Sequence, residues 1–465
     1  MVEVSKVRNR EKLLSHGDLK AREQVIFLMD KVLYEVDAGK RIHELVSLKG
    51  DTLCIGESRW NLGEKRNIYL IGAGKACNAM AQAVCEILGD RITKGVISVK
   101  IKEPQDRYIN TDVYVGGHPL PNAQGMEAAF KILSLIESSD KDDLFISVIS
   151  GGSSALLTCP VENITLEDEI LGQDILLKSG AKIIEINAVR RHISQTNGGK
   201  IAQRIVEAGA ELINLVVSDS VNFTPPVDRR KPYSYFGTPV APDKTTIQDA
   251  RDMIMNYALY DRLPGSITRY LWDDKRVKET PKSFESNVTT FLLGAVSDSC
   301  DAAVRIAEEM NIPLMVLTTF LEGESREAGK ILSSLAREIR YRGNPIAPPC
   351  FVVCAGETTT NIDAKPEGTG GPSHELVLGL AIGIRGIEGI AGASIDTEGT
   401  DGTTLFAGGL VDGSTIDRLH GCGVDIYQAL RNHSTGNALG KINDNIFTGN
   451  TGTNLCDFNI LYVSE

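Results

Sequence analysis

The sequence predicts an α/β protein that is built on parallel β-sheets and divided into two domains. Short apolar runs alternate with longer segments that carry apolar residues at helical spacing, which is the pattern of strands covered by helices. Small residues, mostly Gly and Ser, follow several of these runs, as expected where a strand turns into a helix. The length of 465 residues exceeds that of a typical single domain, so two domains are expected.

The first expected helix lies within residues 19–46, where Leu19, Ile26 and Leu33 share one face and Asp18 can cap the first turn. Further helices are expected up to about Leu88, at 123–136, 299–310 and 324–341, and from about Ser373. The expected strands are 67–71, 96–99, 112–115, 144–149, 212–217, 292–296, 314–318 and 351–355. Active sites of parallel sheets lie at the carboxyl ends of strands, so the loops after these runs are the candidate sites.

Two segments interrupt the alternation. Residues 221–245 contain adjacent prolines and a cluster of basic and aromatic residues, which favours a long loop. Residues 390–415 are rich in Gly, Asp and Thr and are predicted to form an ordered loop.

The composition is that of an ordinary soluble protein, with 42% hydrophobic and 24% charged residues. The formal net charge is −12 and no Lys/Arg run is sustained, which argues against nucleic acid or an anionic membrane as a partner. An anionic substrate would therefore need a locally positive site.

The nine cysteines are scattered, and no pair is spaced as Cys-x-x-Cys. This pattern predicts reduced thiols. The sequence also shows no apolar leader and no run of eighteen apolar residues, so a cytoplasmic protein is expected.

The first chemical motif is the turn that contains Gly72, Gly74 and Lys75, directly after an expected strand. Glycines at a helix start let the backbone approach an anion, although a tight turn alone would also explain them. The match to Gly-x-Gly-x-x-Gly is weak because Cys77 holds the last position, and Lys100 at the end of the second strand disfavours NAD. A cation at a helix start opposes the macrodipole, so Lys75 is predicted to bind phosphate.

Three further segments offer groups for an anionic substrate. Residues 150–155 (Ser-Gly-Gly-Ser-Ser-Ala) follow a strand and can form a nest of backbone N–H groups, although a flexible turn is an equal alternative. Arg190, within residues 187–192, offers a bidentate fork for a carboxylate, while a solvated helix end is the commoner role. His118 can contact a substrate or only anchor its loop.

Acidic residues recur at strand ends and in Gly-rich loops, where oxygen ligands suit Mg²⁺ bound to nucleotide phosphates. Each one alone is most often a surface residue or a helix cap. They are Asp219, Glu357, Glu375, Asp396, Glu398 and Asp401.

Together these segments resemble the glycerate 2-kinase family with a MOFRL-type C-terminal region. The family's Gly-Ala-Gly-Lys-Ala, Gly-His-Pro-x-Pro, Ser-Gly-Gly-x-Ser-Ala-Leu and Asn-x-Val-Arg-x-His-x-Ser motifs match residues 72–76, 117–121, 150–156 and 187–194. Four more segments follow in the family's order, at 321–324, 356–359, 396–402 and 449–454. The resemblance covers nearly the whole chain, and the ordered set is more specific than any one motif.

The resemblance implies two α/β/α domains. The first would be Rossmann-like with a mostly parallel sheet, comprising residues 1–220 and 428–465, and the second, with the MOFRL region, would be inserted at 221–427. The implied activity is phosphorylation of D-glycerate to 2-phosphoglycerate with ATP and Mg²⁺, by in-line phosphoryl transfer. The implied partners are a small hydroxy acid and a nucleotide, and a homodimer is left open.

The resemblance and the motifs together assign roles to residues of this chain. The predicted catalytic residues are Lys75, Arg190 and Asp219. The predicted substrate-binding residues are His118, Ser150, Gly152, Ser153, Ser154 and Asn187. The predicted nucleotide-binding residues are Gly72, Gly74, Glu357, Thr358 and Asn454, and the predicted metal ligands are Asp396 and Asp401. Which acid holds the metal and which accepts the hydroxyl proton is left open.

The chain departs from the family pattern at several positions. The Arg of Gly-Gly-Arg-Asn-Gln-Glu is Pro372, the Lys of Lys-Gly-Gly is Asn197, and the Ser-Asp-Val-Pro-Gly-Asp loop keeps only Ser218 and Asp219. Three alternatives therefore remain: a kinase for a longer sugar acid, an NAD(P)H-dependent hydroxypyruvate reductase, and a binding protein without catalysis.

Overall fold

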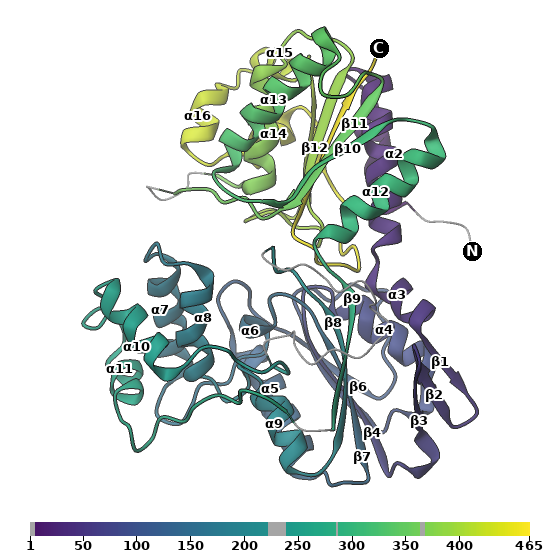
Figure 1. Cartoon of the computed structure of the whole chain (residues 1–465). Coiled ribbons are helices and arrows are strands. Elements are labelled where there is room, and N and C mark those ends of the chain that lie inside the picture. The colour runs from purple at the N-terminus through teal and green to yellow at the C-terminus, as the bar shows by residue number, and fades with distance from the viewer. Residues whose placement is uncertain (1–4, 222–238, 285–286, 363–367) are drawn as a thin grey trace. The chain divides into compact units, whose positions relative to one another are not determined.

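The computed structural model describes residues 5–221, 239–284, 287–362 and 368–465. They form two units, each with its own core (Figure 1). The terminal unit contains Met1–Asp37, Asp219–Pro225 and Gly294–Glu465, and the parallel-sheet unit contains Ala38–Ser218 and Pro226–Leu293. The parallel-sheet unit is thus the one inserted into the other along the sequence.

Six strands form the main sheet of the parallel-sheet unit: β4 (Asn67–Gly74), β5 (Lys94–Val99), β6 (Thr111–Val115), β7 (Asp143–Ile149), β8 (Glu211–Val217) and β9 (Val288–Gly294). Their order is β6-β5-β4-β7-β8-β9. The pairs from β6 to β8 are all parallel, which confirms the predicted parallel sheet in this unit. The central strands are buried nearly throughout, which explains their continuous apolar runs.

Helices cover both faces of this sheet (Figure 1). One face carries α3 (Ala38–Leu45), α4 (Cys77–Leu88) and the antiparallel sheet of β1 (Val46–Lys49), β2 (Thr52–Ile55) and β3 (Ser58–Asn61). The other carries α5 (Ala123–Glu137) and α9 (Lys200–Glu207). The two short 3₁₀ helices are η1 (Leu62–Glu64) and η2 (Gly89–Arg91). Buried side chains of α5 and α9, including Ile132 and Ile205, pack against Ile71 and Phe145 of the sheet.

Four helices of this unit were not predicted from the sequence: α6 (Ser153–Leu156), α7 (Leu166–Leu177), α10 (Ile247–Asn256) and α11 (Gly265–Leu271). Of α8 (Ile183–His192), the sequence indicated only the end, at residues 187–192. All but α6 share a second apolar core with members such as Val189, Ile254 and Leu271. The Thr165 and Thr246 side chains cap α7 and α10 by accepting hydrogen bonds from backbone amides of the first turn. The core and the caps together hold α8 in place, and α8 carries Arg190.

The terminal unit is built on a mixed sheet of six strands: β10 (Leu314–Leu321), β11 (Cys350–Gly356), β12 (Ile390–Asp396), β13 (Gly408–Asp412), β14 (Asn445–Ile446) and β15 (Asp457–Val463). Their order is β10-β11-β15-β12-β13-β14. Only β10 and β11 pair in parallel among the described pairs, and the others are antiparallel.

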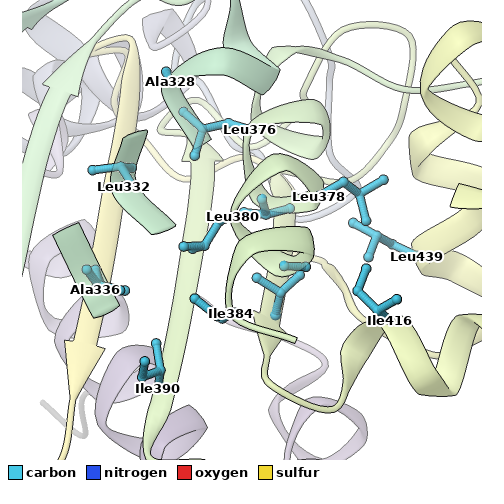
Figure 2. Packing of buried hydrophobic residues seen from close by; sticks show 14 of the residues in the cluster. Ala328, Leu332, Ala336, Leu376, Leu378, Leu380, Ile384, Ile390, Ile416 and Leu439 are labelled. Atoms are coloured by element: carbon cyan, nitrogen blue, oxygen red, sulfur yellow. The ribbon is translucent and has the colours of Figure 1, made fainter. Parts of the chain in front are cut away.

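The helices of the terminal unit lie on both faces of the mixed sheet (Figure 1). α2 (Leu19–Glu35) and α12 (Ser297–Met310) cover one face, and α13 (Ser325–Arg342) and α14 (Pro372–Gly383) cover the other. The remaining helices are α1 (Arg10–Leu13), α15 (Thr415–Gly421), α16 (Ile426–Arg431) and α17 (Thr435–Lys441). Figure 2 shows Leu332 and Leu380 in the core under α13 and α14, with Ile416 and Leu439 from α15 and α17.

The observed division differs from the predicted domain boundaries. β15 pairs with both β11 and β12, so the end of the chain completes the mixed sheet and does not join the parallel one. The N-terminal helix α2 also packs on the mixed sheet, and its Asp18 side chain caps it as predicted, by accepting a hydrogen bond from the Ala21 amide (3.1 Å).

Residues 390–415 are not one loop, because they contain β12 and β13. The sequence hides β12 because its residues are mostly small, and Gly392 shows why: a Cβ there would lie 2.4 Å from a methyl group of Leu380 on α14. The predicted loop at 221–245 lies mainly on residues 222–238, which are outside the described residues. None of the described helices is long and apolar enough to span a bilayer.

Candidate functional site

Two Gly-rich turns meet at the carboxyl ends of β4 and β7. The Lys75 amide donates a hydrogen bond to the Gly151 carbonyl (3.0 Å), and the Ala76 amide donates one to Ser150 Oγ (2.9 Å). Gly74 has a φ of +137°, and a Cβ there would lie 2.1 Å from Ser150 Oγ. Position 74 therefore requires glycine for both conformation and space.

Gly72 is also required by packing, because a Cβ there would lie 2.5 Å from a methyl group of Val148. The close approach of β7 thus accounts for both glycines of the turn. Their contact with a nucleotide phosphate stays a prediction, and it would use the backbone N–H groups beside α4.

A cationic cluster surrounds His118 in the parallel-sheet unit. Gly152 has a φ of +83°, and a Cβ there would lie 3.0 Å from His118 Cδ2 and 3.1 Å from Lys75 Cγ, so these three residues meet. Burial lowers the pKa of His118 well below its usual value, and the charges of Lys75, Lys100 and Arg190 lower it further. His118 is therefore neutral at pH 7, in a region where positive charge is concentrated. The acidic chain thus has the local positive site that an anionic substrate requires.

Arg190 lies in the last turn of α8 and adds a guanidinium to this cluster. Its Nη2 donates a hydrogen bond to Gln173 Oε1 (3.1 Å) and its Nη1 donates one to Asn187 Oδ1 (3.4 Å). Ser153 is buried and Ser154 is half-buried at the start of α6. Arg190, Asn187, His118 and Lys75 thus lie in one unit, and their roles in substrate binding stay predictions.

An acidic cluster lies in the terminal unit around Asp457, the first residue of β15. Burial raises the pKa of Asp457 well above its usual value, and the charges of Asp396, Asp401 and Glu357 raise it further. The Thr358 amide opposes this shift by donating a hydrogen bond of 3.3 Å to Asp457 Oδ2, and the Thr358 hydroxyl also donates to this oxygen (3.3 Å). Negative charge is therefore concentrated at this point.

Asp219 belongs to the terminal unit and lies near the acidic cluster. Asn454 Nδ2 donates a hydrogen bond to Asp219 Oδ2 (3.1 Å), and the Cys456 thiol contacts the Asp219 carbonyl oxygen (2.9 Å). The three predicted catalytic residues are thus distributed over both units, because Lys75 and Arg190 lie in the parallel-sheet unit.

Asp401, a predicted metal ligand, caps helix α14. Its Oδ1 accepts a hydrogen bond from the Ser373 amide (3.2 Å) and its Oδ2 accepts one from the His374 amide (2.9 Å) and another from His374 Nδ1. Asp396 Oδ1 accepts one from the Glu398 amide (3.1 Å). Among the described residues, no three His, Cys, Asp or Glu side chains are arranged to hold a metal ion. The carboxylates are gathered as a cation requires but not arranged as a ready coordination shell.

The sequence did not single out four residues of these clusters. Lys100 follows directly after β5, and this position at a strand end was a signal for the cationic cluster. Asp457 lies directly before an apolar run, and Asp219 lies shortly after one. An acid at one end of an apolar run was therefore a signal that both residues share. Glu169 and Gln173 lie on α7, a helix that was not predicted, and nothing in their spacing marks them.

Two family models match this chain. The family described as "Domain of unknown function (DUF4147)" matches residues 24–272, and the MOFRL family matches residues 350–457. The glycerate 2-kinase of Pyrococcus horikoshii is 36% identical, over 96% of this chain and 98% of that protein. The chain belongs to the glycerate 2-kinase family.

Two further relatives refine the comparison. The crystal structure of a glycerate kinase from Thermotoga maritima is similar with a TM-score of 0.73 and 33% identity, covering 94% of this chain and 98% of that one. A relative from Agrobacterium vitis that carries a provisional name as a hydroxypyruvate reductase is 33% identical, over 85% of this chain and 86% of that protein. In this member of the glycerate 2-kinase family, the cationic cluster lies within the DUF4147 match and the acidic cluster within the MOFRL match.

Proposed function

We propose that the protein transfers the γ-phosphoryl group of ATP to the 2-hydroxyl of D-glycerate, giving 2-phosphoglycerate. The observation that carries the proposal is the cationic cluster of Lys75, Lys100 and Arg190 around a neutral His118, at the strand ends where such sheets bind ligands. The names of the glycerate kinase relatives support the same activity.

In this proposal Lys75 and the amides of the 72–76 turn hold phosphate oxygens, and Arg190 holds the glycerate carboxylate. The Ser153 and Ser154 hydroxyls and the amides of the 150–152 turn orient the substrate. Phosphoryl transfer needs little covalent participation from the protein, since positioning and charge neutralisation lower most of the barrier. His118 stays neutral among the cations and can orient the acceptor hydroxyl by a hydrogen bond.

Mg²⁺ is assigned to the acidic cluster, where Asp396 and Asp401 are the proposed ligands and Asp219 and Glu357 are the alternatives. A divalent cation there would offset the charges of Asp396, Asp401 and Glu357, which add to burial in raising the pKa of Asp457. Bound Mg²⁺ would neutralise nucleotide phosphate oxygens. Thr358 and Asn454, which bond to Asp457 and Asp219, are the proposed nucleotide-binding residues beside it.

The test is a panel of 2-hydroxy acids of increasing length incubated with ATP and Mg²⁺, with ADP release as the measurement and ³¹P NMR to locate the ester. D-glycerate is expected to be the best acceptor. A longer sugar acid as the best acceptor would contradict the proposed substrate but not the kinase. Oxidation of NADH by hydroxypyruvate without any ADP release would contradict the kinase, and this is the alternative raised by the Agrobacterium relative.

Lys75→Ala should lower kcat by about a hundredfold or more, because charge on the transferring phosphoryl group loses its partner. Its melting temperature should change little, because Lys75 is half-buried and the turn is held by backbone hydrogen bonds. Lys131→Ala on the exposed face of α5 is the control. A Lys75→Ala enzyme with wild-type kcat would remove Lys75 from the mechanism.

A further inference from the structure

Arg190 is held by neutral partners only. Its two Nη atoms donate to the amide oxygens of Gln173 and Asn187, and its Nε is buried without a hydrogen-bond partner. Within the part of the chain that the structure describes, no carboxylate forms an ion pair with Arg190. The adjacent Arg191 differs, because its Nη1 pairs directly with the buried Asp243 carboxylate (2.8 Å).

The nearest carboxylate in this chain of hydrogen bonds is that of Glu169, which is separated from Arg190 by the side-chain amide of Gln173. Gln173 Nε2 donates a hydrogen bond to Glu169 Oε1 (3.1 Å), and Glu169 Oε2 accepts one from the Thr158 hydroxyl (2.6 Å). Thr158, Glu169 and Gln173 are all buried. The Gln173 amide therefore spans the carboxylate and the guanidinium, with its N–H toward Glu169 and its oxygen toward Arg190.

We infer that Gln173, backed by Glu169, is a positioning residue that leaves the buried Nε–H of the Arg190 guanidinium without a protein partner, so that it can bind the carboxylate of the substrate. A Glu in direct contact would occupy the fork and cancel its charge. A Gln fixes the same guanidinium through a neutral hydrogen bond and leaves Nε and the positive charge for an incoming anion. The inference rests on the proposed function in one respect, which is that the ligand is a hydroxy acid.

A purely structural role for this chain of hydrogen bonds would be to join α7 to α8. The shared apolar core already does so, and a joint between helices does not explain a buried guanidinium N–H without a partner. Buried polar groups are nearly always satisfied, so an unpaired donor next to the cationic cluster indicates a ligand atom. The structural role remains the alternative that the test must exclude.

The test compares Gln173→Glu and Gln173→Met with the wild-type enzyme. The dissociation constant of D-glycerate is measured by calorimetry, and KM is measured separately for glycerate and for ATP. We expect Gln173→Glu to weaken glycerate binding by about tenfold or more, as for loss of a charge-assisted hydrogen bond, with the KM for ATP unchanged. Gln173→Met removes the hydrogen bond without adding charge and should weaken binding less. Glu169→Gln removes the charge but keeps one acceptor oxygen for the Gln173 amide, and it should have the smallest effect.

Gln82→Glu is the matched control, because Gln82 also bonds to a Glu four residues away (Glu86, 2.9 Å), on the exposed face of α4. Unchanged glycerate affinity in both Gln173 variants, with altered melting temperatures only, would overturn the inference and support the structural role. Wild-type protein that binds no hydroxy acid would overturn it as well. Wild-type protein that binds glycerate but releases no ADP would refute the proposed function alone, and the affinities of the variants would still decide the inference.

Discussion

Arg190 and Arg191 are adjacent on α8 and of the same type, but they differ in role because their neighbours differ. Arg191 has its charge satisfied by the buried Asp243 and therefore fixes structure, whereas Arg190 keeps a buried N–H without a partner. The same reasoning applies to His118. Its cationic neighbours and its burial keep it neutral, so it can accept or donate a hydrogen bond without adding to the positive charge.

The lowered pKa of His118 predicts a pH dependence of stability. Below pH 6.5 the unfolded chain binds a proton at this residue while the folded protein does not, so stability falls as the pH falls, by at most about 1.4 kcal/mol per pH unit. Both tryptophans, Trp60 and Trp272, lie in the parallel-sheet unit, so tryptophan fluorescence during urea unfolding reports on this unit. Between pH 6.5 and 5.5, His118→Asn should lose about 1 kcal/mol less than the wild-type protein.

The control for this experiment is His43→Asn, since His43 is exposed and pairs with Glu86 in the same unit. This variant shows whether the loss of a histidine elsewhere in the same unit has the same effect as His118→Asn. Parallel stability curves for His118→Asn and wild type would show that His118 takes up its proton normally in the folded protein, contrary to the cationic cluster.

At this scale, the sequence was informative where a short motif fixes both position and chemistry. The position of Lys75 was predictable because strand, turn and helix follow directly from the local pattern, and the 150–154 turn was predictable because an apolar strand ends there. Gln173, one partner of Arg190, and Glu169 behind it were not predictable, because they approach Arg190 only after α7 packs on α8. Asp457 was hidden for the same reason, since its like-charged neighbours come from separate loops.

At the scale of elements, a residue that contacts the start of α14 has two candidate roles, because Asp401 caps the helix and is also a proposed metal ligand. The helix begins at Pro372, a favourable first residue that leaves the following amides to be satisfied. Asp401 accepts from two of them, those of Ser373 and His374. A loop carboxylate therefore caps this helix, and any metal would have to share the same oxygens.

Substitutions at Asp401 can separate capping from metal binding. Asp401→Ala should lower the stability of the terminal unit by about 1–2 kcal/mol, as for loss of a helix cap, in the presence and in the absence of Mg²⁺. Asp401→Asn keeps one acceptor oxygen and should lose less stability. If Asp401 also holds Mg²⁺, then Asp401→Asn should need more Mg²⁺ for half-maximal activity.

The role of Asp401 as a helix cap and its role as a Mg²⁺ ligand are tested by different measurements. Thermal unfolding followed by circular dichroism checks the cap, and an Ala variant as stable as wild type would remove Asp401 from that role. A magnesium titration of ADP release checks the ligand. An unchanged requirement in the Asn variant would move the proposed metal site to Asp396 and its other acidic neighbours.

Elements were predictable where side chains are large and alternate with turns, as in β4, β7 and α13. They were missed where close packing replaces large side chains by small ones. β12 is an example, because Gly392 admits Leu380 of α14 and leaves a run of Ala, Gly and Ser that resembles a loop. The joining of β15 to this sheet depends on pairing over a long sequence separation, which no local pattern encodes.

At the scale of the whole chain, α2, which lies near the N-terminus, is part of the unit that the last strand, β15, completes. Arg22 of α2 is fully buried and pairs with Asp412 (2.8 Å) and Asp444 (2.5 Å), both also fully buried. Arg418 pairs with the other oxygen of Asp444 (2.5 Å). Since burying a charge is costly unless it is paired, this network makes the terminal unit depend on residues from both ends of the chain.

Removing the central cation should therefore weaken one unit and spare the other. Arg22→Leu leaves Asp412 and Asp444 buried with fewer partners and should destabilise the terminal unit by about 3–5 kcal/mol. Hydrogen exchange should accelerate in α2, β13 and α15, while the tryptophan fluorescence transition of the parallel-sheet unit stays in place. Arg66→Leu is the mirror control, because Arg66 pairs with the buried Asp143 of β7 (2.5 Å) and should shift the fluorescence transition instead. If either variant shifted both transitions equally, the two units would unfold as one cooperative body, and stability could not be assigned to each unit separately.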